Sequence, residues 1–180
     1  MSADTRSENP MRKIMIGKVT VNIGVGKSGE QLENAKKVLQ QITGQTPSSR
    51  KARKTVKDFG IRKGEPIGCI VTLRGEGASD FLKTSLVAVN NRLKESSFDD
   101  CGNFAFGIKE HIEIPKTRYT PELGIFGMDV TVTLERPGYR VKRRSYHRSN
   151  VGSSHLIDKR EAIDFVRQNF GAEVVGEELP

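Results

Sequence analysis

The residues best suited to chemistry lie between Arg50 and Lys63, in the stretch RKARKTVKDFGIRK. It carries seven Lys or Arg side chains and a single acid, Asp58. Burying so many unpaired charges is too costly, so the stretch must stay in water or meet a polyanion. Phe59, a flat ring among the cations, offers a surface on which a base can stack. This combination favours a nucleic-acid-binding loop over a plain solvated loop or sorting signal, and its charge density argues against an ordered tip without RNA.

A glycine-rich turn, GVGKSG at residues 24–29, indicates a second kind of chemistry, because such turns can cradle phosphate groups. Its three glycines fit the dinucleotide-binding pattern, and Lys27 with Ser28 resembles the end of a phosphate-binding loop. However, Val21 stands where that loop needs a glycine, and no suitable acid follows about twenty residues later. We interpret the motif as a strand-to-helix turn, and a nucleotide-binding enzyme built on it remains the alternative.

Other catalytic patterns are missing from the sequence. The three histidines are not spaced from one another or from the two cysteines as zinc ligands are. Ser153 and Ser154 lack the motif around a nucleophilic serine, and a polar loop explains Glu110 and Glu113 beside His111. We therefore expect no enzymatic activity, no cofactor and no metal.

The overall charge agrees with a nucleic-acid partner. The 180 residues include 30 Lys or Arg against 22 Asp or Glu, giving a formal charge of +8. A second basic run, residues 136–148, contains no acid, and the sign reverses beyond Arg167. No apolar run reaches the ~18 residues of a membrane span, and two cysteines make no disulfide framework. We expect a reduced, cytoplasmic protein that binds RNA and no membrane.

Alternation of apolar and polar residues predicts three strands, at residues 18–23, 67–74 and 128–135, and two weaker ones at 47–53 and 103–108. Helical periodicity predicts three helices. The first has the apolar stripe 32–42, a capping box of Ser28 and Gln31, and a stop at Gly44. The second opens at Ser79 and runs to Leu93. The third has Asp158 and Glu161 as its cap and ends at Gly171.

This order of elements predicts an α+β two-layer sandwich, with helices on one face of a mainly antiparallel sheet. The other face, which carries Lys18, Thr20, Asn22, Thr72 and Thr131, is expected to stay open and polar, as in many RNA-binding sheets. We expect a single domain at residues 11–171, with a basic loop (residues 50–66) and a basic segment (residues 136–148). A disordered tail (1–10) and an acidic tail (172–180) flank it, and residues 110–127 form a long excursion.

Several motifs in order resemble one family. KVTVNIGVGKSGE, ITGQTP, ARKTVKDFGIRKGEPIGCIVTLRG, ESSFDDCGNFAFGIKEHIEIP and GIFGMDVTVTLERPGYRVKRR are together similar to large-subunit ribosomal protein five, which binds 5S ribosomal RNA. The resemblance covers roughly residues 11–170, and the region after Pro137 is similar to the archaeal and eukaryotic branch. A general RNA-binding regulator or chaperone acting away from the ribosome is the remaining alternative.

The resemblance implies a ribosomal role. Such proteins attach 5S rRNA in the central protuberance, touch the peptidyl-site tRNA, and form a bridge to a small-subunit protein, here through residues 110–127. The implied 5S rRNA contacts are Asn22, Gln45, Phe59 and Thr72, to which the open face adds Lys18, Thr20 and Arg74. The implied tRNA-contacting loop holds Lys54, Lys57, Arg62 and Lys63. Further contacts to large-subunit rRNA are expected from Arg136, Arg140, Lys142, Arg143, Arg144 and Arg148.

Overall fold

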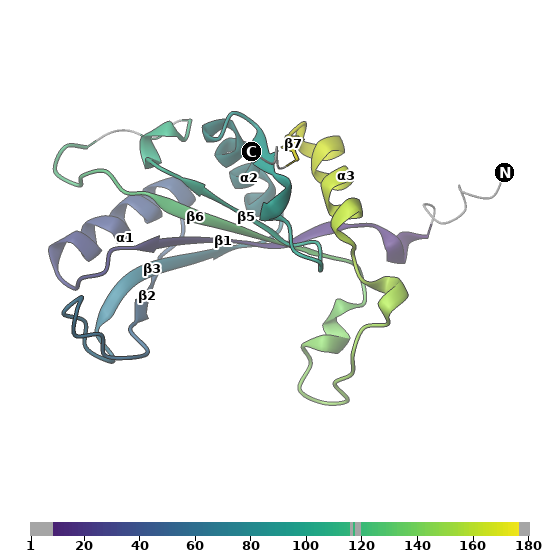
Figure 1. The fold of residues 1–180 in the computed structure, drawn as a ribbon, viewed down its shortest axis with the longest axis horizontal. Helices are drawn as coiled ribbons and strands as arrows, with labels where there is room; N and C mark the ends of the chain where they lie inside the picture. The colour runs from purple at the N-terminus through teal and green to yellow at the C-terminus, as the bar shows by residue number, and fades with distance from the viewer. Residues whose placement is uncertain (1–8, 116, 118–119, 177–180) are drawn as a thin grey trace.

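The computed structural model describes residues 9–115, 117 and 120–176. The elements follow in this order (Figure 1): η1 (Pro10–Arg12), β1 (Met15–Gly24), α1 (Glu30–Thr43), β2 (Ser48–Lys51), β3 (Pro66–Leu73), α2 (Glu76–Ala88), β4 (Arg92–Lys94), η2 (Glu95–Ser97), β5 (Phe104–Ile108), η3 (His111–Glu113), β6 (Met128–Glu135), η4 (Tyr139–Lys142), η5 (Ser153–His155), α3 (Lys159–Phe170) and β7 (Glu173–Val175). Five strands form an antiparallel sheet in the order β2-β3-β1-β6-β5. The five strands expected from the sequence are thus all present.

The core lies on one face of this sheet. In β1, the buried residues Val19, Val21 and Ile23 alternate with partly exposed polar residues. The antiparallel register places Val71 of β3 and Val130 of β6 beside Val21, so the apolar rows continue across the sheet. Buried residues of α1, α2 and α3 pack on these rows. The predicted α+β fold, with helices on one face, is confirmed.

Two of the three expected helix starts are wrong. α1 begins after Gly29, which stands at the N-cap without a side-chain bond, and Ser28 instead donates its hydroxyl to Glu65. The expected capping box of Ser28 and Gln31 is therefore absent. α2 begins after Gly75, three residues before Ser79, and ends at Ala88. Leu93 fits the apolar stripe of this helix because it is also buried, and the predicted helix was therefore too long. In the structure, Leu93 belongs to β4.

The other helix ends are as predicted. Gly44 and Gly171 close α1 and α3 in the left-handed region, with φ of 68° and 63°, which glycine adopts without strain. The backbone N–H of Asp158 donates to Glu161 at 3.2 Å, completing the capping box at the start of α3.

A small parallel sheet of β4 and β7 was not foreseen. It pairs Leu93 with Val174, and Ala172 beside it is buried. Residues 172–175, which we placed in the acidic tail, therefore belong to the fold. Short three-residue strands carry too little periodicity to be read from a sequence. The other parts of the two predicted tails are mostly outside the described residues. These are residues 1–8 and 177–180, whereas Asn9, Pro10 and Gly176 are described.

Candidate nucleic-acid interface

The face of the sheet opposite the helices carries ordered rows of polar side chains. One row runs across three strands as Thr72, Thr20 and Thr131. The next row aligns Ser48, Ile70, Asn22 and Asp129 across four strands. Directly opposed residues in an antiparallel sheet lie about 5 Å apart, so the polar groups lie close together, with Ile70 as an apolar interruption between Ser48 and Asn22. Asp129 is the acid in this surface, and it is exposed.

The predicted site residues of the sheet lie where the alternation placed them. Lys18, Thr20, Asn22 and Thr72 are all partly exposed on the open face. Arg74 follows the end of β3 and is exposed. Gln45 lies in the connection between α1 and β2 and is exposed as well. All of these side chains are therefore accessible to a partner.

The basic loop folds into a hairpin between β2 and β3. Ala52 and Glu65 close its base, since the Ala52 N–H donates to the Glu65 carbonyl at 2.8 Å. Val56 and Ile61 exchange both backbone hydrogen bonds, at 2.9 and 3.1 Å, below the tip. The charge density of the loop predicted a disordered tip. That argument does not consider backbone hydrogen bonds, and the bonds seen here do not support the prediction.

The aromatic and cationic side chains of this hairpin have no internal partner among the described residues. Phe59 lies at the tip and is 74% exposed. Among the described residues, none of the seven Lys and Arg side chains from Arg50 to Lys63 has an acid partner within 4.0 Å. A polyanion therefore meets these cations without first displacing an internal ion pair.

A carboxylate fixes the base of the hairpin to the turn after β1. Glu65 accepts the hydroxyl hydrogen of Ser28 at 2.5 Å and the backbone N–H of Arg62 at 3.1 Å. The Ser28 bond is the main cause that lowers the pKa of Glu65, and the Arg62 N–H adds to it. Ser28 thus acts on the loop, a role that its position before α1 concealed.

The glycine-rich turn itself does not form a phosphate cradle. The first two backbone N–H groups after β1, those of Val25 and Gly26, both donate to the carbonyl of Ile67, at 3.0 and 2.9 Å. In addition, β1 has only antiparallel neighbours, whereas the dinucleotide motif belongs to a parallel βαβ unit. The turn is structural, as the sequence favoured.

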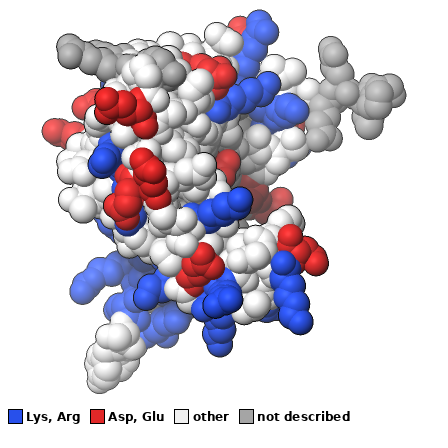
Figure 2. Space-filling model, turned by 90° about the vertical axis from the view of Figure 1, so that its left-hand side faces the viewer, with Lys and Arg blue, Asp and Glu red and all other residues white. Residues whose placement is uncertain are grey.

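A dense group of positive charges lies at one end of the molecule (Figure 2). Figure 1 shows the basic loop and the region that follows β6 extending from the lower side, while α2 and α3 lie above the sheet. Figure 2, turned by 90° about the vertical axis, shows a dense group of Lys and Arg at the same lower end, while further Lys and Arg and most acids lie higher up. Two basic projections therefore extend to the same side.

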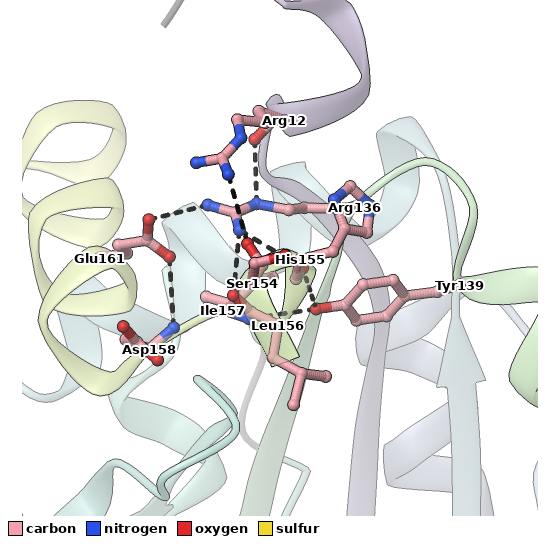
Figure 3. A network of polar contacts seen from close by, with 9 residues as sticks. All are labelled: Arg12, Arg136, Tyr139, Ser154, His155, Leu156, Ile157, Asp158 and Glu161. Atoms are coloured by element: carbon pink, nitrogen blue, oxygen red, sulfur yellow. Dashed lines mark hydrogen bonds and ion pairs between the residues drawn. The ribbon is translucent and has the colours of Figure 1, made fainter. Parts of the chain in front are cut away.

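Arg136, the first residue of the basic segment, is buried and acts within the fold (Figure 3). Its Nε donates to the carbonyl of Arg12 at 3.0 Å, and Nη2 meets the Glu161 carboxylate at 2.9 Å. Nη1 donates to the carbonyls of His155 and Leu156, at 3.3 and 3.0 Å. Because its donors point inward, we remove Arg136 from the residues proposed to contact RNA.

Tyr139 completes this network at the other side of the segment. Its hydroxyl donates to the His155 carbonyl at 3.2 Å and accepts the Ile157 N–H at 3.1 Å. Burial is the main cause that raises the pKa of Tyr139, so the hydroxyl remains a donor. The network joins η1, the end of β6 and the start of α3.

Arg143 is also engaged. Its guanidinium forks onto Glu135, with Nη1–Oε1 and Nη2–Oε2 distances of 2.7 and 2.9 Å. Gly17 makes this arrangement possible, because a Cβ at that position would lie 2.6 Å from the Glu135 side chain. The remaining predicted contacts of the segment, Arg140, Lys142, Arg144 and Arg148, are exposed.

The excursion after β5 is only partly described, since residues 116, 118 and 119 of the predicted bridge region lie outside the described residues. Its first part packs on the fold: His111 and Ile114 are buried, and the His111 Nδ1 accepts the Phe126 N–H at 3.3 Å. Burial lowers the pKa of His111, so this ring stays neutral. A neutral, buried histidine between Glu110 and Glu113 fits a structural role.

The described residues offer neither a metal site nor a membrane span. No cluster of three or more His, Cys, Asp or Glu there is arranged to hold a metal ion. None of the helices in that part of the chain combines the length and the apolar character that a bilayer crossing requires.

Comparison with known proteins identifies the family. One family model, described as Ribosomal protein L5, matches residues 9–62, and a second, which describes the C-terminus of the same ribosomal protein family, matches residues 66–165. The chain belongs to the ribosomal protein L5 family. It is therefore a structural constituent of the large ribosomal subunit and not an enzyme, as the motifs implied, and its place is the ribosome.

Archaeal relatives cover almost the whole chain. The large ribosomal subunit protein uL5 of Pyrobaculum aerophilum is 56% identical over 92% of this chain and 93% of its own length. Those of Sulfurisphaera tokodaii and Methanococcoides burtonii are 52% and 50% identical, over 96% and 92% of this chain and 98% of their own lengths in both cases. These relatives are archaeal, which confirms the archaeal and eukaryotic branch inferred from the region after Pro137.

Sequence reasoning missed two exposed aromatic residues in the basic segment, Tyr146 and His147. Their rings lie 3.9 Å apart beside three arginines. The signal was available, because a ring among cations is the feature that singled out Phe59.

Proposed function

We propose that this member of the uL5 family binds 5S rRNA on the open face of its sheet and attaches it within the central protuberance. The observation that carries the proposal is the open face itself, with hydroxyl and amide side chains aligned across four strands beside a hairpin of unpaired cations. Folded RNA presents 2′-hydroxyls and phosphates, which such a surface can bind by hydrogen bonds and charge neutralisation.

The two parts of this surface have different tasks. Asn22, Thr20 and Thr72 offer hydrogen bonds at fixed positions, because their strands, β1 and β3, each pair with a strand on either side. Asp129 beside Asn22 repels phosphate but can accept a hydrogen bond from a 2′-hydroxyl, which orients the RNA backbone. Lys18, Arg74 and Gln45 at the margins then meet phosphates or base edges.

The hairpin extends this contact. Phe59 lies at its exposed tip and offers a stacking surface to a base of the same RNA. Lys54, Lys57, Arg62 and Lys63 flank it along the sequence of the hairpin, and we propose that they reach the peptidyl-site tRNA. The bridge to a small-subunit protein is proposed for residues 110–127, the other excursion from the sheet.

Binding of 5S rRNA tests the face directly. We expect Phe59→Ala to weaken binding by roughly 1–3 kcal/mol and Asn22→Ala by about 1 kcal/mol, measured at one fixed salt concentration. Matched controls lie on the helix side: Val87→Ala for an exposed apolar residue and Asn169→Ala for an exposed amide. If both test variants are folded and bind as tightly as wild type, the site assignment is wrong.

Selectivity separates ribosomal attachment from general RNA binding. We expect the protein to prefer 5S rRNA over tRNA-sized competitors at matched salt, and to sediment with large subunits. Equal affinity for all of these RNAs would support the alternative of an RNA chaperone.

The proposed contact to tRNA has its own test. Replacing Lys54, Lys57 and Arg62 by Gln should impair tRNA placement in reconstituted ribosomes more than it impairs 5S rRNA attachment. Equal loss of both would mean that the hairpin has a single partner.

A further inference from the structure

The exposed part of the basic segment encloses a hollow of about 530 Å³, which falls in the size range of sites for small ligands. The structure builds it from a few neighbouring residues: Arg140, Arg143, Arg144, Ser145, Tyr146 and His147. No acid lines it. The hollow therefore has the size and the charge for an anionic group with a ring attached.

Internal hydrogen bonds hold the walls of this hollow. The backbone N–H groups of Arg143 and Arg144 both donate to the Arg140 carbonyl at 2.9 Å, which extends η4 by a turn. The Nε of Arg144 donates to the carbonyl of His147 at 2.7 Å, and His147 has a left-handed φ of 49° that turns its carbonyl toward the arginine. The buried Arg136 network lies at the foot of the same segment. A site held in this way loses little entropy when it binds.

The arginines of the hollow differ in what they can still bind. Glu135 already neutralises Arg143. Within the described residues, Arg140 and Arg144 have no carboxylate partner, and only the Nε of Arg144 is used. Its two terminal nitrogens are then available to a phosphate, which arginine binds with two parallel hydrogen bonds.

Tyr146 supplies the other half of a nucleotide site. It is 77% exposed, and the edge-to-face contact with His147, at 69° between ring planes, fixes its ring from one side. An exposed tyrosine ring held beside free arginines matches the way in which proteins bind unpaired bases.

We propose that this hollow binds one unpaired nucleotide of ribosomal RNA, with its phosphate on Arg140 and Arg144 and its base stacked on Tyr146. This site is separate from the open face and the hairpin, and it rests on the proposed function only in taking RNA as the ligand. The chemistry is the same for 5S and for large-subunit rRNA, so the experiment uses each of them in turn.

A single fluorescent residue reports on the site, since the chain contains no tryptophan. In the full-length Tyr146→Trp variant, we expect rRNA purified from archaeal large subunits to quench the indole fluorescence, because a stacked base quenches it. Arg144→Gln in this background should reduce the quenching at saturating RNA. Arg160→Gln, which removes the same charge from the exposed start of α3, should leave it unchanged. Separately, Tyr146→Ala should weaken binding of the responding RNA about 5- to 150-fold, and Tyr146→Phe should preserve it.

The outcomes distinguish this proposal from the wider function. Unquenched fluorescence with both RNAs, while 5S rRNA still binds normally, would overturn the hollow as a site and leave the open face standing. Quenching by large-subunit rRNA alone supports the hollow and assigns it to that RNA. Quenching that Arg160→Gln reduces as much as Arg144→Gln would overturn the assignment of the phosphate.

Discussion

The basic loop and the basic segment are similar runs of cations, but the fold uses their side chains differently. In the basic loop, backbone hydrogen bonds and the Glu65 carboxylate provide the structure, and the cations stay free. In the basic segment, Arg136 and Arg143 provide the structure themselves, through Glu161, Glu135 and three backbone carbonyls. Charge counted along the sequence therefore overstates what the segment can offer to RNA.

The difference has a physical origin. A hairpin between paired strands satisfies its backbone groups locally, so it needs no charged side chain for support. The basic segment follows β6 without strand pairing, and the carbonyls of Arg12, His155 and Leu156 beside it need donors. Arginine, with five N–H groups in a fixed plane, can satisfy several carbonyls and a carboxylate together.

The largest expected effect comes from Arg136→Ala. The change leaves three carbonyls and Glu161 without their donor, so we expect a loss of about 3 kcal/mol in the free energy of unfolding, measured with urea. Arg140→Ala, an exposed neighbour, should change it by less than about 0.5 kcal/mol. If Arg136→Ala leaves stability unchanged but weakens RNA binding, Arg136 is an RNA ligand. The basic segment would then use this arginine in the same way as the basic loop uses its cations.

The triple change of Lys54, Lys57 and Arg62 to Gln should leave stability unchanged, since no internal partner is lost. Binding of tRNA, however, should become less dependent on salt: the slope of log affinity against log salt should fall by about 2 to 3, at roughly 0.7–0.9 per phosphate contact. The matched control replaces three cations on the helix side that do have acid partners, Lys36, Arg92 and Lys159. An equal change in that control would show that net charge, not position, governs binding.

The sequence predicted the parts of this contrast that depend on local pattern. Alternation in β1, β3 and β6 placed Asn22 and Thr72 on the open face, because side-chain direction in a strand depends only on parity. It could not reveal that Arg136 is buried, since the partners of Arg136 lie 19 to 124 residues away. Ser28 shows the same limit, because its position before a helix fits a cap equally well, and only the approach of Glu65 decides.

A smaller effect is expected from Glu135→Gln, which releases Arg143 from its ion pair. Because an ion pair at the surface, such as Arg143 with Glu135, contributes at most about 1 kcal/mol, we expect the affinity for large-subunit rRNA to rise by up to about fivefold at low salt. Glu95→Gln, which releases Lys159 on the helix side with the same change in net charge, is the control. A fall in affinity would indicate that Glu135 orients Arg143 for RNA and does not compete with it.

The smallest effect concerns the base of the basic loop and its dependence on pH. The Ser28 hydroxyl, followed by the Arg62 N–H, lowers the pKa of Glu65 in the folded protein. The folded chain therefore binds this proton more weakly than the unfolded chain does, and the stabilising contribution of Glu65 is complete above its unfolded pKa. It is lost only as the pH falls through the lowered value.

The backbone N–H of Arg62 reports this titration by NMR, because it donates to Glu65. We expect its chemical shift to change with a midpoint below the ordinary glutamate value. Ser28→Ala should move that midpoint upward, because it removes the main cause of the shift, whereas Ser49→Ala in β2 should not. A midpoint that is insensitive to Ser28→Ala would mean that backbone hydrogen bonds alone hold the hairpin. The basic loop and the basic segment would then differ only in whether their arginines have internal partners. The Glu65 carboxylate would have no part in holding the loop.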